Sequence, residues 1–163
     1  MEYLWRVISA VLASEVFPAR VRMHLMYWSG CAVSHRSSVI LAGALFGSKN
    51  FMIEEGVFLN KNFYFDGAAR LTIAKNTQIG AFVRVVTGSH AIDSNPLYRC
   101  GRHVTAPVSI GEGCWIGSGT TILPGVTVAR GCVIGAGSIV AKSTEPDGLY
   151  FGIPARWIRD LPC

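Results

Sequence analysis

The hydrophobic positions in the second half of the chain keep a period of six. They are Ile110, Ile116, Ile122, Val128, Ile134 and Val140. Glycines keep the same spacing, at Gly113, Gly119, Gly125, Gly131 and Gly137. Neither the 3.6-residue period of a helix nor the two-residue period of a strand explains this repeat. Six residues suit one short strand and a corner, and three such units close a triangular coil of about 18 residues. The pattern therefore predicts a parallel β-solenoid with aliphatic side chains inside and glycines at corners that require positive φ.

The same period can be followed upstream with two interruptions. It runs through Ile53, Leu59 and Phe65 and, after two inserted residues, through Ile73, Ile79 and Val85. Between Val85 and Ile110 it is lost in a polar stretch rich in turn formers. A long loop inside a regular scaffold is usually functional. We therefore expect a protruding functional loop over about residues 87–107.

Residues 1–37 predict an N-terminal helical segment that caps the solenoid. They are apolar, but charges and Pro18 interrupt them too often for a transmembrane helix. Glu2 stands where a secretory signal would be positive. We expect a cytoplasmic protein, with a helix that packs on the body of the fold. The alternative is peripheral contact at the inner face of the membrane, where Arg6, Arg20 and Arg22 would meet anionic lipid.

The other end of the chain predicts a second cap. The solenoid itself is expected over residues 38–145, and the period ends before a turn at Pro146 and Asp147. Within residues 146–163, the stretch "ARWIRDL" suggests a short C-terminal helix. Such a cap would protect the strand edges that an open solenoid end exposes.

Composition narrows the class of partner. The chain has 163 residues, 50% of them hydrophobic, with a net charge of +5. This charge suits an anionic ligand, and no run of Lys and Arg interleaved with aromatic residues indicates nucleic acid. The five cysteines form no CxxC pair, which favours a reducing compartment. Cys114 and Cys132 occupy a repeat position that holds small side chains, so we interpret them as packing residues.

Four motifs carry a resemblance to a known family. They are "TGSH", "PVSIGEGCWIGSGTTILPGVTV", "VIGAGSIVAK" and "GIPAR". With them, about residues 38–160 resemble the hexapeptide-repeat acyltransferases, in the branch of maltose, galactoside, nodulation-factor and xenobiotic O-acetyltransferases. The resemblance implies a left-handed parallel β-helix, acetyl-CoA as donor, no metal, and a homotrimer with active sites between subunits. The left hand comes from the resemblance alone, because parallel crossovers are nearly always right-handed.

The resemblance also assigns catalytic residues. His90 falls on the family's general base, and a neutral imidazole can take the proton of an attacking hydroxyl. The backbone N–H of Ser118 falls on the donor that stabilises the oxyanion. Asn60 matches an asparagine that faces the acceptor and the histidine of an adjoining subunit. Asp93 is a candidate to hold a sugar hydroxyl, and His103 is the alternative base.

A further set of residues matches the family's donor site. Trp115 corresponds to a tryptophan beside the pantetheine and acceptor pocket. Small residues let the pantetheine arm approach the main chain, and cations suit the phosphates of coenzyme A. These positions are Gly117, Ser118, Ala136, Lys142, Arg156 and Arg159.

The sequence thus favours an acetyl-CoA-dependent O-acetyltransferase. Its acceptor would be a hydroxyl of a saccharide or glycan intermediate of the capsule, exopolysaccharide or lipopolysaccharide type. Three alternatives stay open: a xenobiotic O-acetyltransferase, a non-catalytic solenoid that binds partners, and a γ-carbonic-anhydrase-like zinc enzyme. The zinc enzyme needs three converging imidazoles, and only His90 and His103 lie near the loop. Residues 1–37 match the family poorly, so the acceptor cannot be named from the resemblance.

Overall fold

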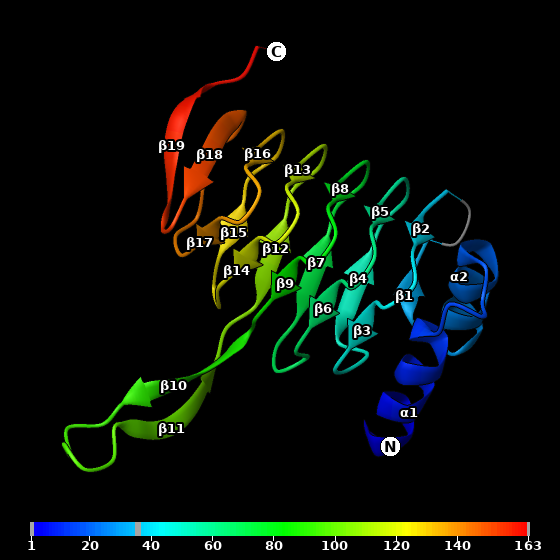
Figure 1. The fold of residues 1–163 in the computed structure, drawn as a ribbon, viewed down its shortest axis with the longest axis horizontal. Coiled ribbons are helices and arrows are strands. Elements are labelled where there is room, and N and C mark those ends of the chain that lie inside the picture. Colours follow the sequence, from blue (N-terminus) through cyan, green and yellow to red (C-terminus); the bar gives the residue numbers. More distant parts are fainter. Residues whose placement is uncertain (1, 35–36, 163) are drawn as a thin grey trace.

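The computed structural model describes residues 2–34 and 37–162 and forms a three-sided parallel β-solenoid (Figure 1). The first face contains β1 (Ala32–Val33), β4 (Phe51–Ile53), β7 (Leu71–Ile73), β12 (Val108–Ile110) and β15 (Thr127–Val128). The second contains β2 (Val39–Ile40), β5 (Phe58–Leu59), β8 (Gln78–Ile79), β13 (Trp115–Ile116), β16 (Val133–Ile134), β18 (Gly148–Gly152) and β19 (Ala155–Asp160). The third contains β3 (Leu45–Phe46), β6 (Tyr64–Phe65), β9 (Arg84–Val85), β14 (Thr121–Ile122) and β17 (Ile139–Val140). The fold is the predicted left-handed β-helix.

The core follows the predicted period. All six aliphatic residues of the second-half repeat are at most 1% exposed. All five of its glycines have positive φ, between 67° and 79°. The pairing register explains the upstream insertion, because Met52 pairs with Thr72, 20 positions on, whereas Ser109 pairs with Thr127, 18 positions on. Each coil therefore keeps its inward side chains aligned despite the change in coil length.

The interruption of the repeat is a β-hairpin that projects from the solenoid (Figure 1). It consists of β10 (Gly88–Ile92) and β11 (Cys100–Thr105), which pair antiparallel. The chain leaves the third face after β9 and returns to the first face at β12. Because β12 pairs with β7 in the continuing register, the hairpin is an insertion that leaves the scaffold intact.

Two helices cap the first coil, as expected. Helix α1 (Glu2–Ala13) packs on β3, and α2 (Ala19–Trp28) packs on β1 and β2. The indole Nε1 of Trp5 donates to the carbonyl of Phe46, and the N–H of Phe46 donates to Ser9 Oγ. These bonds satisfy backbone groups of an edge strand that would otherwise be open to another chain. Within the described residues, no helix combines the length and apolar character needed to cross a bilayer.

Arg22 does not lie where the membrane alternative requires it. It is only 2% exposed, and its guanidinium donates to four carbonyls, those of Leu12, Ser14, Phe17 and Ile40. Burial lowers the pKa of Arg22. The five donors of an arginine match this crowd of carbonyls at the turn between the helices. Arg22 therefore holds the two helices and the first coil together, and it does not contact lipid.

The predicted C-terminal helix is also wrong. Residues 155–160 form β19, which pairs antiparallel with β18, and β18 extends the second face by pairing with β16. The hairpin turns at Gly152, where φ is +105°. Pairing with the last coil satisfies an open sheet edge, and this long-range gain outweighs local helix propensity. At the opposite boundary, β1 already pairs with β4, so the first coil begins at Ala32.

We predict that Arg22→Met lowers the free energy of unfolding by about 2 to 4 kcal/mol, because four buried carbonyls lose their donor. Urea unfolding followed by circular dichroism measures this. The control is Arg20→Met, which changes an exposed arginine of the same helix and should cost less than about 0.5 kcal/mol. Equal effects of the two variants would contradict the structural role of Arg22.

Candidate functional site

The projecting hairpin presents His90 with one ring nitrogen fixed. The Nδ1 atom of His90 lies 2.9 Å from the carbonyl oxygen of Gly101 on the facing strand. A carbonyl can only accept, so Nδ1 carries the hydrogen and donates it. In the neutral ring, Nε2 then holds the free lone pair. The side chain is exposed, so Nε2 is available to a hydroxyl of a bound molecule.

His103 lies directly across the hairpin from His90. The two residues are register partners, and their ring centroids are 5.3 Å apart in an edge arrangement. A Cβ added at Gly88 would lie 3.0 Å from His103 Nε2 and 3.4 Å from Asp66 Oδ2. A larger residue at position 88 would therefore have to displace these side chains. The two histidines and a carboxylate gather around the base of the hairpin.

Asp66 is a site residue that the sequence analysis missed. Its carboxylate accepts hydrogen bonds from the amides of Thr87 and Gly88, both 2.9 Å long, and from the Thr87 hydroxyl and the Ala68 amide. Burial favours the neutral carboxyl, but these hydrogen bonds outweigh it and lower the pKa of Asp66. The available signal was register, since Asp66 lies one coil below the point where the period is lost. Asp66 fixes the direction in which β10 leaves the solenoid.

Donor-site candidates gather at the corner between the second and third faces. Gly117 lies against the next coil, where an added Cβ would be 2.5 Å from the nitrogen of Ala136. An added Cβ at Gly80 would be 2.5 Å from the nitrogen of Ser118. Among the hydrogen bonds of residues 2–34 and 37–162, none uses the N–H of Ser118 or Ala136 as donor. Both residues are exposed, so adjacent coils offer two free N–H groups.

Gly117 and Asn60 lie at the same corner, but neither contributes a free backbone N–H group. The N–H of Gly117 donates to Ile134, so Gly117 contributes its lack of a side chain and not a donor. Asn60 lies below Gly80 along this corner, since its N–H donates to the carbonyl of Ile79. Its Oδ1 accepts a hydrogen bond from the amide of Lys61.

The remaining donor-site candidates lie on or next to several different strands. Trp115 is 61% exposed on the second face. In the C-terminal hairpin, Arg156 pairs with Phe151, whose ring covers Gly135 beside the Ala136 corner. Arg159 lies in the same outer strand, β19. Lys142 follows β17 on the third face, whereas the two arginines lie on a strand of the second face.

A single chain does not bring His90 to the Ser118 corner. The hairpin leaves between the third and first faces, whereas Ser118 lies between the second and third. No contact recorded for the described part of the chain joins His90 to Asn60 or Ser118. Asp93 lies at the hairpin tip, where its Oδ1 accepts from the amide of Asn95. The molecule therefore holds two separate half-sites.

The two internal cysteines have a packing role, as predicted. Cys114 and Cys132 are at most 1% exposed. Burial raises the pKa of Cys114 to about 11, so its thiol stays protonated and unreactive at neutral pH. Across residues 2–34 and 37–162, no three His, Cys, Asp or Glu side chains gather at metal-binding distance.

Comparison with known proteins relates the chain to hexapeptide-repeat transferases. Residues 107–142 match the family model for the bacterial transferase hexapeptide with six repeats. The chain is 40% identical over 107 residues to nodulation protein L of Rhizobium meliloti, covering 66% of this chain and 58% of that protein. It is 35% identical over 112 residues to galactoside O-acetyltransferase of Escherichia coli, covering 69% and 55%. The chain spans a little over half the length of these curated relatives.

A solved structure extends the likeness over the whole fold. It is a hexapeptide-repeat-containing acetyltransferase from Vibrio cholerae in complex with acetyl coenzyme A. The two chains superpose with a TM-score of 0.80 and 26% identity, over 99% of this chain and 89% of that one.

We predict that Asp66→Asn lowers the free energy of unfolding at pH 7 by about 1 to 2 kcal/mol, because an amide cannot accept all four hydrogen bonds. The lowered pKa means that the carboxylate stabilises the fold above its unfolded pKa of about 4 and loses this effect as pH falls through the folded value. The deficit of the variant should therefore shrink between pH 7 and pH 3 in urea unfolding. Glu145→Gln, at an exposed carboxylate, is the control. A deficit that does not change with pH would contradict the assignment.

Proposed function

The chain belongs to the hexapeptide-repeat transferases, and from that premise we propose that it is an acetyl-CoA-dependent O-acetyltransferase. The acceptor would be a hydroxyl of a saccharide or of a capsule, exopolysaccharide or lipopolysaccharide intermediate. The observation that carries the proposal is His90, exposed on a projecting hairpin and held through Nδ1 so that Nε2 is free. This is the arrangement that a general base for a hydroxyl requires.

The Ser118 corner supplies the groups that a thioester donor needs. The free N–H groups of Ser118 and Ala136 suit the carbonyl oxygens of an acetyl thioester and a pantetheine arm. Gly117 lets the coil that carries Ala136 pack directly against the coil that carries Ser118, which brings the two N–H groups onto adjacent coils. Arg156 and Arg159 lie on β19, which extends the second face beside this corner, and their guanidinium groups are suited to bind phosphate. The Vibrio cholerae structure, which holds acetyl coenzyme A on the same fold, supports the choice of acetyl-CoA as donor.

The residues divide the reaction between them. His90 Nε2 would take the proton of the acceptor hydroxyl as its oxygen attacks the thioester carbonyl. The Ser118 N–H would donate to the carbonyl oxygen as it becomes negative. When the new C–O bond has formed and the C–S bond breaks, the imidazolium would return its proton to the leaving thiolate. The products are the acetyl ester and free coenzyme A, and neither metal nor redox chemistry is needed.

The separation of the half-sites supports an assembly. Since one chain does not place His90 beside its own Ser118, we propose that the hairpin of one subunit completes the corner of another, in a homotrimer. Asn60 would then face the histidine of the adjoining subunit, and Asp93 at the hairpin tip would reach a sugar hydroxyl. We place this assembly in the cytoplasm. Contact of α1 with the membrane surface would involve its exposed residues Leu4, Val7 and Val11.

We predict that His90→Ala lowers turnover by about 100-fold or more, because the acceptor hydroxyl loses its base. Release of free thiol from acetyl-CoA with a saccharide acceptor measures this. His103→Ala is the matched variant on the facing strand and should keep turnover within about threefold. If His103→Ala carried the larger loss, the two histidines would exchange roles, and if neither variant mattered, the mechanism would be wrong.

We further predict that Arg156→Gln and Arg159→Gln each weaken coenzyme A binding by about tenfold, since each removes a cation suited to phosphate. Isothermal calorimetry with coenzyme A provides the measurement. Arg102→Gln, which changes an exposed arginine of β11, should leave the affinity unchanged. Affinity that falls equally in all three variants would instead indicate a general effect of net charge.

A further inference from the structure

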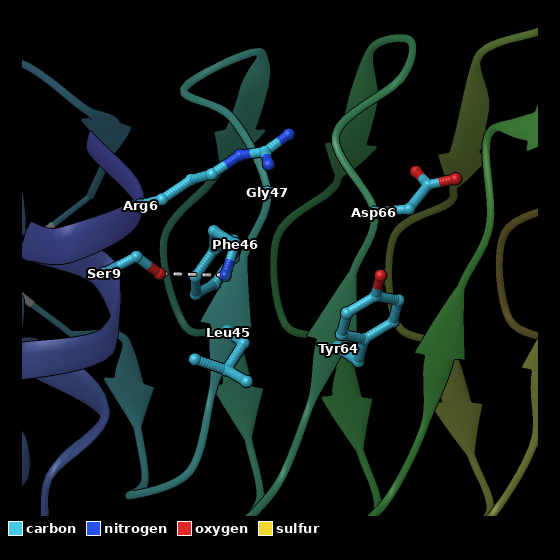
Figure 2. Close-up of a pocket in the computed structure, with 7 residues that line it drawn as sticks. All are labelled: Arg6, Ser9, Leu45, Phe46, Gly47, Tyr64 and Asp66. Carbon is cyan, nitrogen blue, oxygen red and sulfur yellow. Dashed lines mark hydrogen bonds between the residues drawn. The ribbon is translucent and has the colours of Figure 1, made fainter. Parts of the chain in front are cut away.

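A groove lies where α1 meets the third face of the solenoid. Its volume is about 260 Å³. Figure 2 shows Arg6 and Ser9 entering it from α1, and Leu45, Tyr64 and Asp66 from the third face. The groove is therefore built partly from the segment that matches the family poorly and partly from the repeat.

The position of α1 over this groove is fixed. Trp5 and Ser9, on either side of Arg6 along the helix, both hydrogen-bond to the backbone of Phe46. Trp5 and Ser9 are 3% and 4% exposed, so the helix cannot roll without breaking buried contacts. The base of the Arg6 side chain is consequently held beside the groove while its guanidinium stays exposed.

Some polar groups of the groove are already hydrogen-bonded, and others are free to bind a ligand. The Asp66 carboxylate already accepts four hydrogen bonds from residues 68, 87 and 88. In the described part of the chain, no hydrogen bond or ion pair engages the Arg6 guanidinium or the Tyr64 hydroxyl. The groups left free are thus a permanent cation and a phenol. Such a surface complements an anion next to a ring that can lie on the exposed face of Tyr64.

The negative charge of Asp66 also lines the groove and limits where an anion can bind. Figure 2 shows the charged ends of Arg6 and Asp66 apart from each other, with Tyr64 below them. An acidic group therefore belongs at the α1 side, against Arg6. Neutral hydroxyls of the same molecule would lie toward Asp66 and Tyr64.

The groove shares Asp66 with the base of the hairpin that carries His90. Asp66, which lines it, is the residue that holds the amides of Thr87 and Gly88, and His90 follows two residues later on β10. We propose that this groove binds the acceptor, and that Arg6 selects saccharides that bear an acidic group, a carboxylate or a phosphate. The inference rests on the proposed O-acetyltransferase activity and adds the substrate class to it.

The test compares matched acceptors with wild type and Arg6 variants. Methyl glucoside, methyl glucuronide and glucose 6-phosphate present a neutral group, a carboxylate and a phosphate. In the thiol-release assay, wild type should favour at least one acidic acceptor about tenfold or more in kcat/KM. Arg6→Gln should remove that preference by raising KM, with kcat and the neutral acceptor unchanged, and Arg6→Lys should restore part of it. Arg20→Gln, at an exposed arginine of the neighbouring helix, should keep the preference.

The outcomes separate the inference from the activity it rests on. The acidic acceptor that Arg6→Gln affects identifies carboxylate or phosphate as the ligand group. Equal use of neutral and acidic acceptors by wild type, or an equal loss for all acceptors in Arg6→Gln, would overturn the inference and leave the activity standing. If wild type neither releases thiol nor binds coenzyme A, the proposed activity fails. In that case, calorimetry with methyl glucuronide and glucose 6-phosphate tests whether the groove binds an acidic saccharide. Binding that depends on Arg6 supports the inference, and no such binding overturns it.

Discussion

Close contact between the corners of successive coils is the constraint on which this molecule depends. A Cβ at Gly80, Gly117 or Gly47 would lie within 2.5 Å of the backbone of the next coil. The solenoid strands are only two or three residues long, so each contributes few hydrogen bonds to its sheet. The fold is therefore stable only when many coils stack in register and stabilise one another. Such stacking needs small residues where coils touch and positive φ where the chain turns. Every other feature of the protein is an addition to this repeat or a cover for its ends.

The same constraint creates the chemistry. A corner that touches its neighbour uses some of its backbone groups in the ladder and turns others outward. Gly117 belongs to the first kind, and Ser118 and Ala136 to the second. Free N–H groups at a rigid corner are preorganised donors, which lose no entropy when they meet a developing negative charge. In the proposed mechanism the solenoid thereby supplies the anion-stabilising site from its main chain, whereas the base comes from a side chain on an inserted element.

Prediction from sequence succeeded where the cause of structure is local. Side-chain direction within six residues fixes which positions point inward, so Ile110 and its equivalents revealed the coil, and the lost period revealed the hairpin. It failed where the cause lies far along the chain. Residues 155–160 look helical alone, yet they pair with a strand that extends the sheet. Asp66 has partners 21 and 22 positions away, which cannot be seen without the coil register. Arg22 is typical of a surface residue until the packing of the two helices on the first coil brings four carbonyls around it.

The capping helix shows how one structural need can provide a specificity element. The first coil has an open edge, and α1 covers it through Trp5 and Ser9, which bond both backbone groups of Phe46. Once a helix is pinned there, the residues between the two contacts have fixed positions. One of them, Arg6, lines the groove at the third face together with Asp66, which also anchors the hairpin. The repeat fixes the corner of Ser118 and Ala136 through the contacts between coils, but a cap has to satisfy only the edge. Its outward and groove-facing residues can therefore change without harm to the fold, which makes the cap the physically least constrained place for acceptor choice to be encoded.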